Sequence, residues 1–255
     1  MAVISDLFKV FEIGPVFRAE NSQTNRHMCE FVGMDFEMEI KEHYHELLKV
    51  LGNLFVYIFD NLNKSCQKEL EAVNKQWPFT PLVYKRETPV LSFKEAIKML
   101  KDDATVEVED LQDIRYSPKF DCVSTPAEKR LGKLVKEKYG VDFYIVDQYP
   151  RNARPFYTMI SAEDPNYTNS YDVFLRGEEI TSGAQRIHHI PLLKQRAEEC
   201  GIPLNNIDKY LESFQYGAYP HGGAGIGLER VVMLFMGLHD IRMSSLFPRD
   251  PKRLA

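Results

Sequence analysis

The sequence predicts an α+β fold with a mainly antiparallel sheet flanked by helices. Two observations support this class. Segments with the alternation or the apolar runs of strands lie toward both ends of the chain, and segments with helical spacing fill the middle. Near the start, two alternating segments enclose a polar, turn-rich stretch, which indicates a long antiparallel hairpin. With 255 residues, 44% of them hydrophobic, the chain can form one large domain or two small ones.

The hairpin accounts for the first 40 residues. Residues 1–7 have the pattern of a helix end, and Gly14-Pro15 is expected to bend the first strand into two pieces. The strands and the polar turn are predicted, in chain order, at residues 8–13, 16–20, 21–27 (the turn) and 31–40.

Helices dominate the next hundred residues. Apolar residues recur at helical spacing, and the capping boxes Ser92/Glu95 and Thr125/Glu128 mark the starts of two helices. Several prolines and an acidic, weakly periodic stretch make residues 77–119 a variable surface region. The predicted helices cover residues 41–63, 65–74, 92–100 and 125–139.

The last part of the chain mixes both element types. Short apolar or alternating runs predict strands, and longer periodic runs predict helices around a glycine-rich bend. The predicted strands cover residues 143–146, 156–160, 170–176 and 178–187; the predicted helices cover 191–200, 204–214 and 228–236, with the bend at 222–227.

Charge and cysteine content limit the class of protein. Thirty-two basic and 37 acidic residues leave a net charge of -5, so any contact with RNA must use a local patch or a segment outside this chain. The four cysteines form no C-x-x-C pair, which disfavours a zinc site or a disulfide framework. Without a membrane-length apolar run or a signal-peptide pattern, the prediction is a soluble, cytoplasmic protein with no membrane contact.

The hairpin carries an unusual set of charges. Arg18 and Glu20 are two residues apart on one strand and project from the same face. Carboxylates, Asp35 among them, alternate with apolar residues on the return strand. This pattern fits a structural lattice of ion pairs, or a site in which Arg18 binds a phosphate and the carboxylates bind a cation or an amine.

A second charged segment, YDVFLRGEEITSGAQR, covers residues 171–186. Its Asp172 and Glu179 are either exposed charges on strands or ligands of magnesium, which prefers carboxylates together with substrate phosphates. Arg186 has the planar guanidinium that can bind a planar carboxylate through two hydrogen bonds.

The glycine-rich segment GGAGIGLERVVMLF covers residues 222–235. It lacks the G-K-[ST] of a phosphate-binding Walker loop, and Leu228 stands where a dinucleotide-binding loop has its last glycine. Its glycines allow either close packing of helix on sheet or close approach of the backbone to a ligand.

Together these segments resemble the three signature regions of one enzyme family. The run FRAENSQTNRHMCEF at residues 17–31 closely resembles motif 2 of class II aminoacyl-tRNA synthetases, and G-x-G-x-E-R at residues 225–230 resembles motif 3. The pattern R-x-E followed by R-H-x-x-E-F is specific to the aspartyl, asparaginyl and lysyl subgroup. FPRDPKR at residues 247–253 also resembles the ending of that family. Within the subgroup, the chain resembles the aspartyl enzymes of archaea and of the eukaryotic cytosol, and the resemblance implies the class II synthetase catalytic fold.

The resemblance implies an ATP site with catalytic arginines. Arg18 matches the arginine that grips the α-phosphate, and Arg230 matches the arginine that covers adenine and contacts the γ-phosphate. His27 matches a histidine near the outer phosphates, and Phe31 matches the ring that stacks on adenine. The remaining residues implied for ATP binding are Glu20, Met28, Glu30, Glu179 and Gly227.

The resemblance also implies sites for the other reactants. Asp35, Ser182, Arg186 and Gly225 match substrate-pocket positions of aspartyl enzymes. Asparaginyl relatives usually carry glutamate where this chain has Asp35. The implied Mg²⁺ ligands are Asp172, Glu179 and Ser182. The residues that match the loop meeting the tRNA acceptor end are Ser22 and Thr24.

The implied activity is that of an aspartate–tRNA ligase. ATP activates L-aspartate as aspartyl-adenylate with Mg²⁺ as cofactor, and the aspartyl group then passes to the 3' end of tRNA(Asp). The family's anticodon-binding OB-fold, its dimer-forming motif 1 and a substrate-binding lysine precede the part that residues 1–255 match. The chain is therefore expected to be the catalytic core, to bind ATP weakly and charge tRNA poorly alone, and to be homodimeric in a longer protein, where it can join a multi-synthetase assembly. The alternatives are an asparaginyl or other class II ligase, a non-catalytic synthetase-like module and, last, a structural protein.

Overall fold

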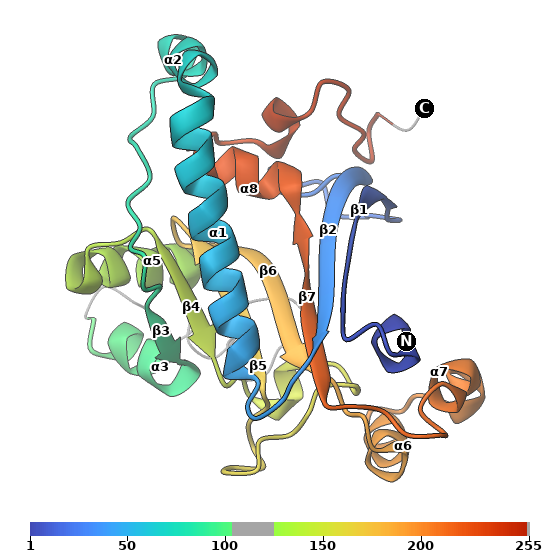
Figure 1. Ribbon diagram of the computed structural model, residues 1–255. Helices are drawn as coiled ribbons and strands as arrows, with labels where there is room; N and C mark the ends of the chain where they lie inside the picture. The colour runs from blue at the N-terminus through green and yellow to red at the C-terminus, as the bar shows by residue number, and fades with distance from the viewer. Residues whose placement is uncertain (104–124, 254–255) are drawn as a thin grey trace.

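A computed structural model describes residues 1–103 and 125–253 (Figure 1). Its centre is a seven-stranded sheet with the order β1-β2-β7-β6-β5-β4-β3. Neighbouring strands are antiparallel except β3 and β4, which are parallel. The predicted α+β class is therefore confirmed. The strands are β1 (Lys9–Phe17), β2 (Glu30–Glu39), β3 (Val90–Ser92), β4 (Phe143–Asp147), β5 (Ser170–Leu175), β6 (Glu178–Gln185) and β7 (His221–Gly227).

Helices cover the sheet and its ends (Figure 1). Short 3-10 turns complete the connections at Ala2–Ser5, Arg151–Ala153, Leu204–Asn206 and Ile241–Ser244. No helix in the described ranges is long and apolar enough to cross a membrane. The helices are α1 (His45–Ser65), α2 (Gln67–Gln76), α3 (Phe93–Lys101), α5 (Thr125–Tyr139), α6 (Ile190–Glu199), α7 (Asp208–Glu212) and α8 (Leu228–Phe235).

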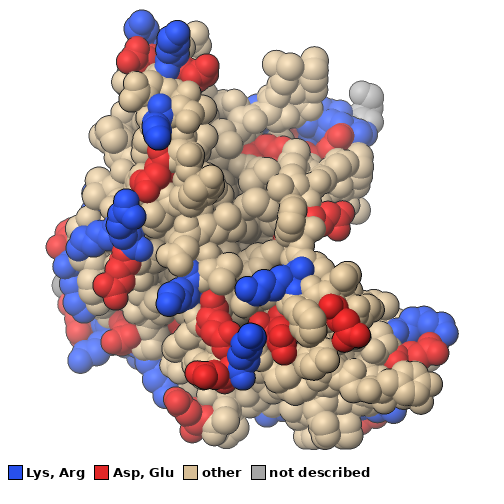
Figure 2. Space-filling view, viewed as in Figure 1, with Lys and Arg blue, Asp and Glu red and all other residues tan. Residues whose placement is uncertain are grey.

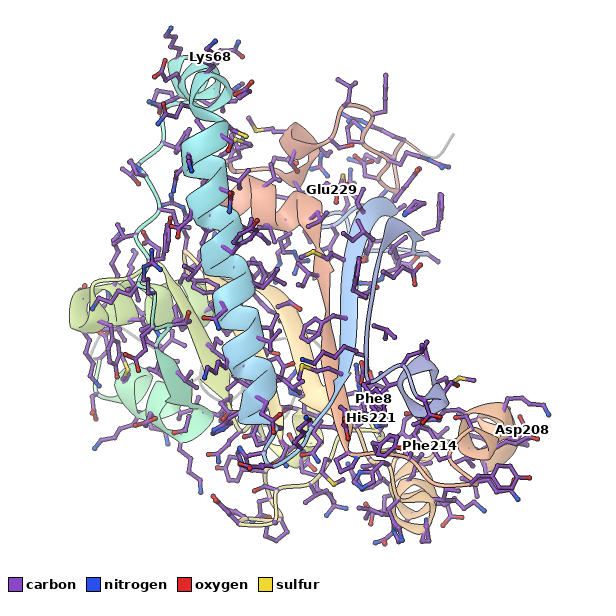
Figure 3. All side chains as sticks on the ribbon, in the orientation of Figure 1. Phe8, Lys68, Asp208, Phe214, His221 and Glu229 are labelled. Carbon is purple, nitrogen blue, oxygen red and sulfur yellow. The ribbon has the colours of Figure 1, made fainter. Side chains whose placement is uncertain are left out.

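The hairpin of β1 and β2 forms as expected, but Gly14-Pro15 does not break it. Pro15 pairs with Val32 in an uninterrupted register, and β1 is the edge strand of the sheet, where a missing backbone donor is tolerated. The Val32 backbone N–H donates instead to the carboxylate of Glu229, 3.0 Å away in the first turn of α8 (Figure 3). The predicted bend is therefore wrong.

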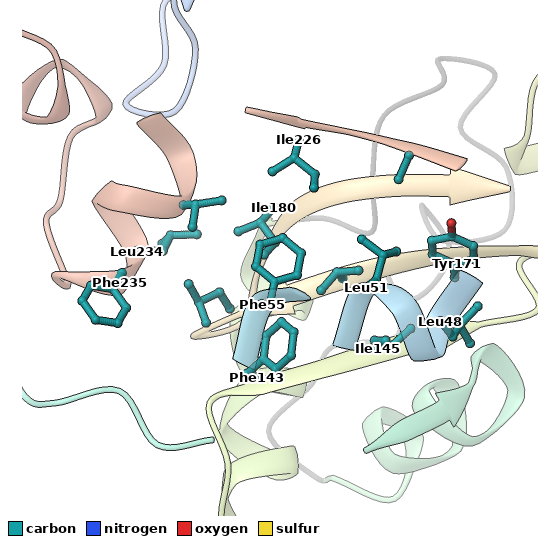
Figure 4. Close-up of a cluster of buried hydrophobic side chains, with 14 of the residues drawn as sticks. Leu48, Leu51, Phe55, Phe143, Ile145, Tyr171, Ile180, Ile226, Leu234 and Phe235 are labelled. Carbon is teal, nitrogen blue, oxygen red and sulfur yellow. The ribbon is translucent and has the colours of Figure 1, made fainter. Parts of the chain in front are cut away.

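The main core lies between α1 and one face of the sheet (Figure 4). Leu47, Leu51, Phe55 and Phe59 recur every fourth residue on α1 and are fully buried. They pack with residues of β4, β5, β6, β7 and α8, among them Phe143, which closes a ring cluster with Phe55 and Phe59. This layer covers one face of the central strands and leaves their opposite face available for a site.

A second core lies beneath α3 and α5. The four apolar residues of β4, 143–146, are all buried because successive side chains alternate between the two cores. The capping box at Ser92 and Glu95 is confirmed at the start of α3. In α5, the Glu128 carboxylate pairs instead with Arg26, 3.3 Å away, and the side chain of Thr125 lies outside the described residues. Residues 104–119 of the predicted surface region also lie outside them.

Three local predictions in the last hundred residues differ from the structure. The glycine-rich bend at 222–227 is a strand, β7, whose glycines let β2 and β6 approach on both sides. Residues 156–160 do not form the predicted strand. Thr158 and Ile160 each make one isolated bridge, to Arg186 and Thr168 respectively. Helix 204–214 is shorter than predicted and is divided into a 3-10 turn and α7. The short parallel strand β3 was not predicted from the sequence.

Candidate active site

The face of the sheet opposite the main core carries a cavity of about 510 Å³. Alternation along β2, β6 and β7 sends one set of side chains to the core and the next set to the cavity. Of the residues predicted for a site, twelve line this cavity: Arg18, Glu20, His27, Met28, Phe31, Asp35, Glu179, Ser182, Arg186, Gly225, Gly227 and Arg230. The four predicted residues outside its lining are Ser22, Thr24, Glu30 and Asp172.

The floor of the cavity depends on Gly225. It pairs with Asp35 on one side and with Ser182 on the other. A Cβ atom at this position would lie 2.5 Å from Asp35 Oδ1, so any larger residue would displace that carboxylate. The Thr181 hydroxyl donates to the carbonyl of Gly225 at 2.5 Å and fixes the strand from behind. Glycine therefore keeps the cavity open between the two strands.

One part of the cavity is formed by the segment that links β1 and β2. The guanidinium of Arg18 lies 5.5 Å from the centre of the Phe31 ring. The Ser22 backbone N–H donates to Glu20 at 2.9 Å and lowers the pKa of that carboxyl, although burial opposes the change. Thr24 Oγ1 lies 2.5 Å from His27 Nδ1. Ser22 and Thr24 therefore lie at the rim of the cavity, where they contact the lining residues Glu20 and His27. Arg18 and His27 remain in the lining.

Arg230 on α8 links the β1–β2 connection to β6 beside the cavity. Its guanidinium donates to the carbonyl of Arg26 at 3.0 Å and to the carbonyl of Glu179 at 3.2 Å. Arg26 in turn pairs with Glu128, whose side chain is only 2% exposed. Burial, reinforced by Glu179, raises the pKa of Glu128 to about 8 even though Arg26 opposes the change. Sequence reasoning assigned no site role to Arg26 or Glu128.

Two carboxylates and a hydroxyl lie at the side of the cavity formed by β5 and β6. Ser182 Oγ is 2.6 Å from Asp172 Oδ1 and 3.2 Å from Glu179 Oε1. Burial and the nearby Asp172 raise the pKa of Glu179. Asp172 is 6% exposed and lies behind Ser182, where Arg154 Nη2 approaches its Oδ1 to 2.7 Å.

These groups bear on the predicted magnesium site. The buried carboxylate of Asp172, the half-buried carboxylate of Glu179 and one hydroxyl are hard oxygen donors, and a cation would offset both the burial and the nearby Asp172 charge that raise the pKa of Glu179. The donor set therefore suits a magnesium ion that takes its other oxygens from phosphates and water. In residues 1–103 and 125–253, no group of three or more His, Cys, Asp or Glu side chains is arranged to hold a metal.

Arg186 occupies another part of the lining, in contact with Glu37. Its Nε lies 3.1 Å from Glu37 Oε1 and its Nη2 lies 3.3 Å from Oε2, while the guanidinium stacks 4.9 Å from the Tyr157 ring. Burial, with Glu12 and Glu37 nearby, raises the pKa of Asp35. Sequence reasoning gave Glu37 no separate role, although its position two residues after Asp35 places both on one face.

In the view of Figure 2, acidic and basic side chains are intermingled on the molecular surface and form no cluster comparable to the charged groups of the cavity.

The Glu30 carboxylate pairs with Arg249 at 3.0 Å, which ties the start of β2 to the C-terminal segment. Away from the cavity, His221 stacks on Phe214 at 5.8 Å, where β7 meets the end of α7 (Figure 3).

An antiparallel sheet with an arginine-lined cavity, a motif 2 hairpin and a motif 3 strand and helix defines the catalytic domain of a class II synthetase. The family model for "tRNA synthetases class II (D, K and N)" matches residues 1–251, and the chain belongs to this family.

Curated relatives and solved structures agree with this assignment. Aspartate–tRNA ligase 2, cytoplasmic, from Arabidopsis thaliana is 56% identical over 255 residues, which are 100% of this chain and 44% of that protein. The cytoplasmic aspartate–tRNA ligase of Homo sapiens is 53% identical over 254 residues, covering 100% of this chain and 49% of that protein. The chain spans about half the length of these relatives.

Two solved structures are similar over almost the whole chain. The aspartyl tRNA synthetase from Entamoeba histolytica has a TM-score of 0.89 and 50% identity, covering 99% of this chain and 50% of that one. The asparaginyl-tRNA synthetase from Pyrococcus horikoshii, complexed with asparaginyl-adenylate, has a TM-score of 0.80 and 30% identity, covering 99% and 55%.

Proposed function

We propose that this chain is the catalytic core of an aspartate–tRNA ligase that uses ATP to activate L-aspartate and transfers it to the 3' end of tRNA(Asp). One observation carries the proposal. A single cavity is lined both by the predicted nucleotide residues, Arg18 and Arg230 among them, and by the predicted aspartate residues Asp35 and Arg186. The identity to curated aspartate–tRNA ligases supports the same substrate.

The adenylate-forming step needs positioning and positive charge more than a covalent nucleophile. The aspartate α-carboxylate attacks the α-phosphorus of ATP, and pyrophosphate leaves. Arg18 neutralises charge at the α-phosphate while Phe31 stacks on adenine. Arg230, held by two backbone carbonyls, is already oriented before ATP binds and loses little freedom on binding.

Magnesium would be held by Asp172, Glu179 and Ser182 together with phosphate oxygens, and it would neutralise phosphate charge there. Glu179 and Ser182 line the cavity, so their oxygens are open to a bound nucleotide. The ion pair of Asp172 with Arg154 makes Asp172 the less available of the two carboxylates.

Selection of aspartate over asparagine is assigned to Arg186. The contact with Glu37 uses Nε and Nη2, which leaves Nη1 for the side-chain carboxylate of the substrate. A neutral amide would offer Nη1 no negative charge in this partly buried site, so asparagine binds less well. Asp35 supplies a carboxylate for the substrate ammonium group.

The other partners follow the same proposal. Ser22 and Thr24 lie at the rim of the cavity, where they can meet the acceptor end of tRNA. A homodimer is supported by the apolar side chains that edge strand β1 exposes: Phe11 is 79% exposed, Ile13 57% and Phe17 67%. A cytoplasmic location is supported by the relatives whose names include it. Membership of a multi-synthetase assembly stays a prediction.

Pyrophosphate exchange with ATP and single amino acids tests the proposal. Aspartate should support exchange, and asparagine and lysine should not. The assay compares the exchange rates that different amino acids support, so even a slow rate identifies the substrate. Arg186→Leu should abolish exchange with aspartate. Arg196→Leu controls for loss of an arginine, because Arg196 is buried and is not among the residues that line the cavity. Exchange supported by asparagine instead of aspartate would reject the substrate assignment.

A further inference from the structure

Arg154 is an enclosed cation that no sequence motif indicated. Its side chain is 12% exposed, and its guanidinium carbon lies 3.9 Å from the centre of the Tyr149 ring. Nη2 is 2.7 Å from Asp172 Oδ1, and Nη1 is 3.5 Å from Ser182 Oγ. Arg154 does not line the cavity, so it acts on a bound ligand through the residues it touches.

The surroundings of Arg154 use its charge more than its hydrogen bonds. Among the described residues, its Nε has no hydrogen-bond partner, although burying an unbonded N–H is unfavourable. Besides the Nη1 contact with Ser182, Arg154 makes an ion pair with Asp172 and a cation–π contact with Tyr149, and the last two require a positive group. A neutral residue of similar size would lose both.

Arg154 changes the net charge of the carboxylate group beside the cavity. Asp172 and Glu179 are two carboxylates on either side of Ser182, with one cation, Arg154, on Asp172. Arg154 therefore lowers by one the negative charge that these two carboxylates present to a divalent ion. Asp172 is held back from the cavity, and Glu179 is left facing it.

We propose that Arg154 is a positioning residue that sets the charge of the metal site by holding Asp172. The inference rests on the proposed function, because it concerns the magnesium site of that reaction. With Arg154 in place, a divalent cation alone binds weakly. The phosphates of ATP would supply further negative charge, so a divalent cation would bind more tightly when the nucleotide is present.

Binding of Mn²⁺, a paramagnetic substitute for Mg²⁺, tests the inference without measuring activity. Electron paramagnetic resonance would give the Mn²⁺ affinity of the whole chain, without nucleotide and with a non-hydrolysable ATP analogue. Arg154→Gln should bind Mn²⁺ without nucleotide at least about tenfold more tightly than the unchanged chain, because an opposing buried charge is gone. Arg154→Lys keeps the charge and should stay near the unchanged value. Structural damage alone would weaken binding.

A second pair of variants keeps the test decisive if Arg154→Gln fails to fold, since a lone buried carboxylate is strongly destabilising. Asp172→Asn removes one negative charge and should weaken Mn²⁺ binding. The double variant Arg154→Gln/Asp172→Asn restores the original net charge and should bind Mn²⁺ more tightly than Asp172→Asn alone. The matched control is Arg196→Gln, which should change nothing: Arg196 is buried too, and its Nε has no hydrogen-bond partner in the part of the chain that the structure describes.

Two results would overturn the inference. If the double variant binds Mn²⁺ no more tightly than Asp172→Asn, Arg154 does not act through its charge. If the unchanged chain binds no Mn²⁺ even with the nucleotide analogue, the magnesium site itself is wrong. That second result would not contradict the assignment of aspartate as substrate, which the pyrophosphate-exchange assay tests separately. Failure of the inference and failure of the proposed function are therefore distinguishable.

Discussion

Replacing Glu128 with glutamine should stabilise the protein at alkaline pH. The Glu128 side chain is 2% exposed, and burial, reinforced by Glu179, raises its pKa from 4.5 to about 8. Below pH 4.5 the carboxyl is protonated in the folded and unfolded chains alike. As pH rises from 4.5 to 8, the unfolded chain ionises while the folded one keeps its proton, so the free energy of unfolding falls. At about 1.4 kcal/mol per pKa unit, the loss above pH 8 is at most about 5 kcal/mol.

Urea unfolding of both proteins at pH 5, 7 and 9 measures this difference. Glu128→Gln should match the unchanged chain within about 1 kcal/mol at pH 5 and exceed it by several kcal/mol at pH 9. Glu137→Gln, at an exposed position of the same helix, controls for loss of a carboxylate. If the ion pair with Arg26 outweighs burial instead, Glu128→Gln will be the less stable protein at every pH above 5, and the reasoning is refuted.

Two further predictions concern ATP and the sheet. Arg18→Gln should weaken ATP binding about tenfold or more in calorimetry, because a charge-assisted contact to phosphate is lost; an unchanged affinity would remove Arg18 from the nucleotide site. Gly223→Ala should lower the free energy of unfolding by about 3 kcal/mol, since its Cβ would lie 1.9 Å from the carbonyl oxygen of Phe36. Gly14→Ala, whose Cβ meets nothing closer than 3.9 Å, is the control, and equal losses in urea would contradict the packing argument.

Much of the fold was predictable because local patterns agree with the global arrangement. The four-residue spacing of Leu47, Leu51 and Phe55 predicted α1, and the capping box at Ser92 predicted the start of α3. The errors came from tertiary context. Pro15 was expected to bend its strand, but β1 is an edge strand that loses nothing by lacking one donor.

The glycine-rich segment shows the same limit more clearly. A run of glycines carries no strand propensity, so residues 222–227 were predicted as a bend. In the sheet, Gly223 is required because the backbone of the neighbouring strand leaves no room for a Cβ atom, and a Cβ atom at Gly225 would displace the Asp35 carboxylate. Packing between strands decides the structure there, and no pattern within the segment reports it.

The site was predictable where it lies in motifs and was missed elsewhere. Twelve residues predicted from the resemblance line one cavity, although they come from segments far apart in the chain. Asp172 lies behind that lining. Arg154 and Glu128 were missed because each acts through one distant partner, Asp172 for the first and Arg26 for the second. A single sequence gives no signal for such a pair.

The central claim is that this cavity binds activated aspartate, and binding of a stable aspartyl-adenylate analogue tests it most directly. Isothermal titration of the chain should give tight binding of the aspartyl analogue and at least about tenfold weaker binding of the asparaginyl analogue, because a neutral amide offers Nη1 of Arg186 no negative charge. Arg186→Leu should remove that preference. Equal affinity for the two analogues, or tighter binding of the asparaginyl one, would contradict the account.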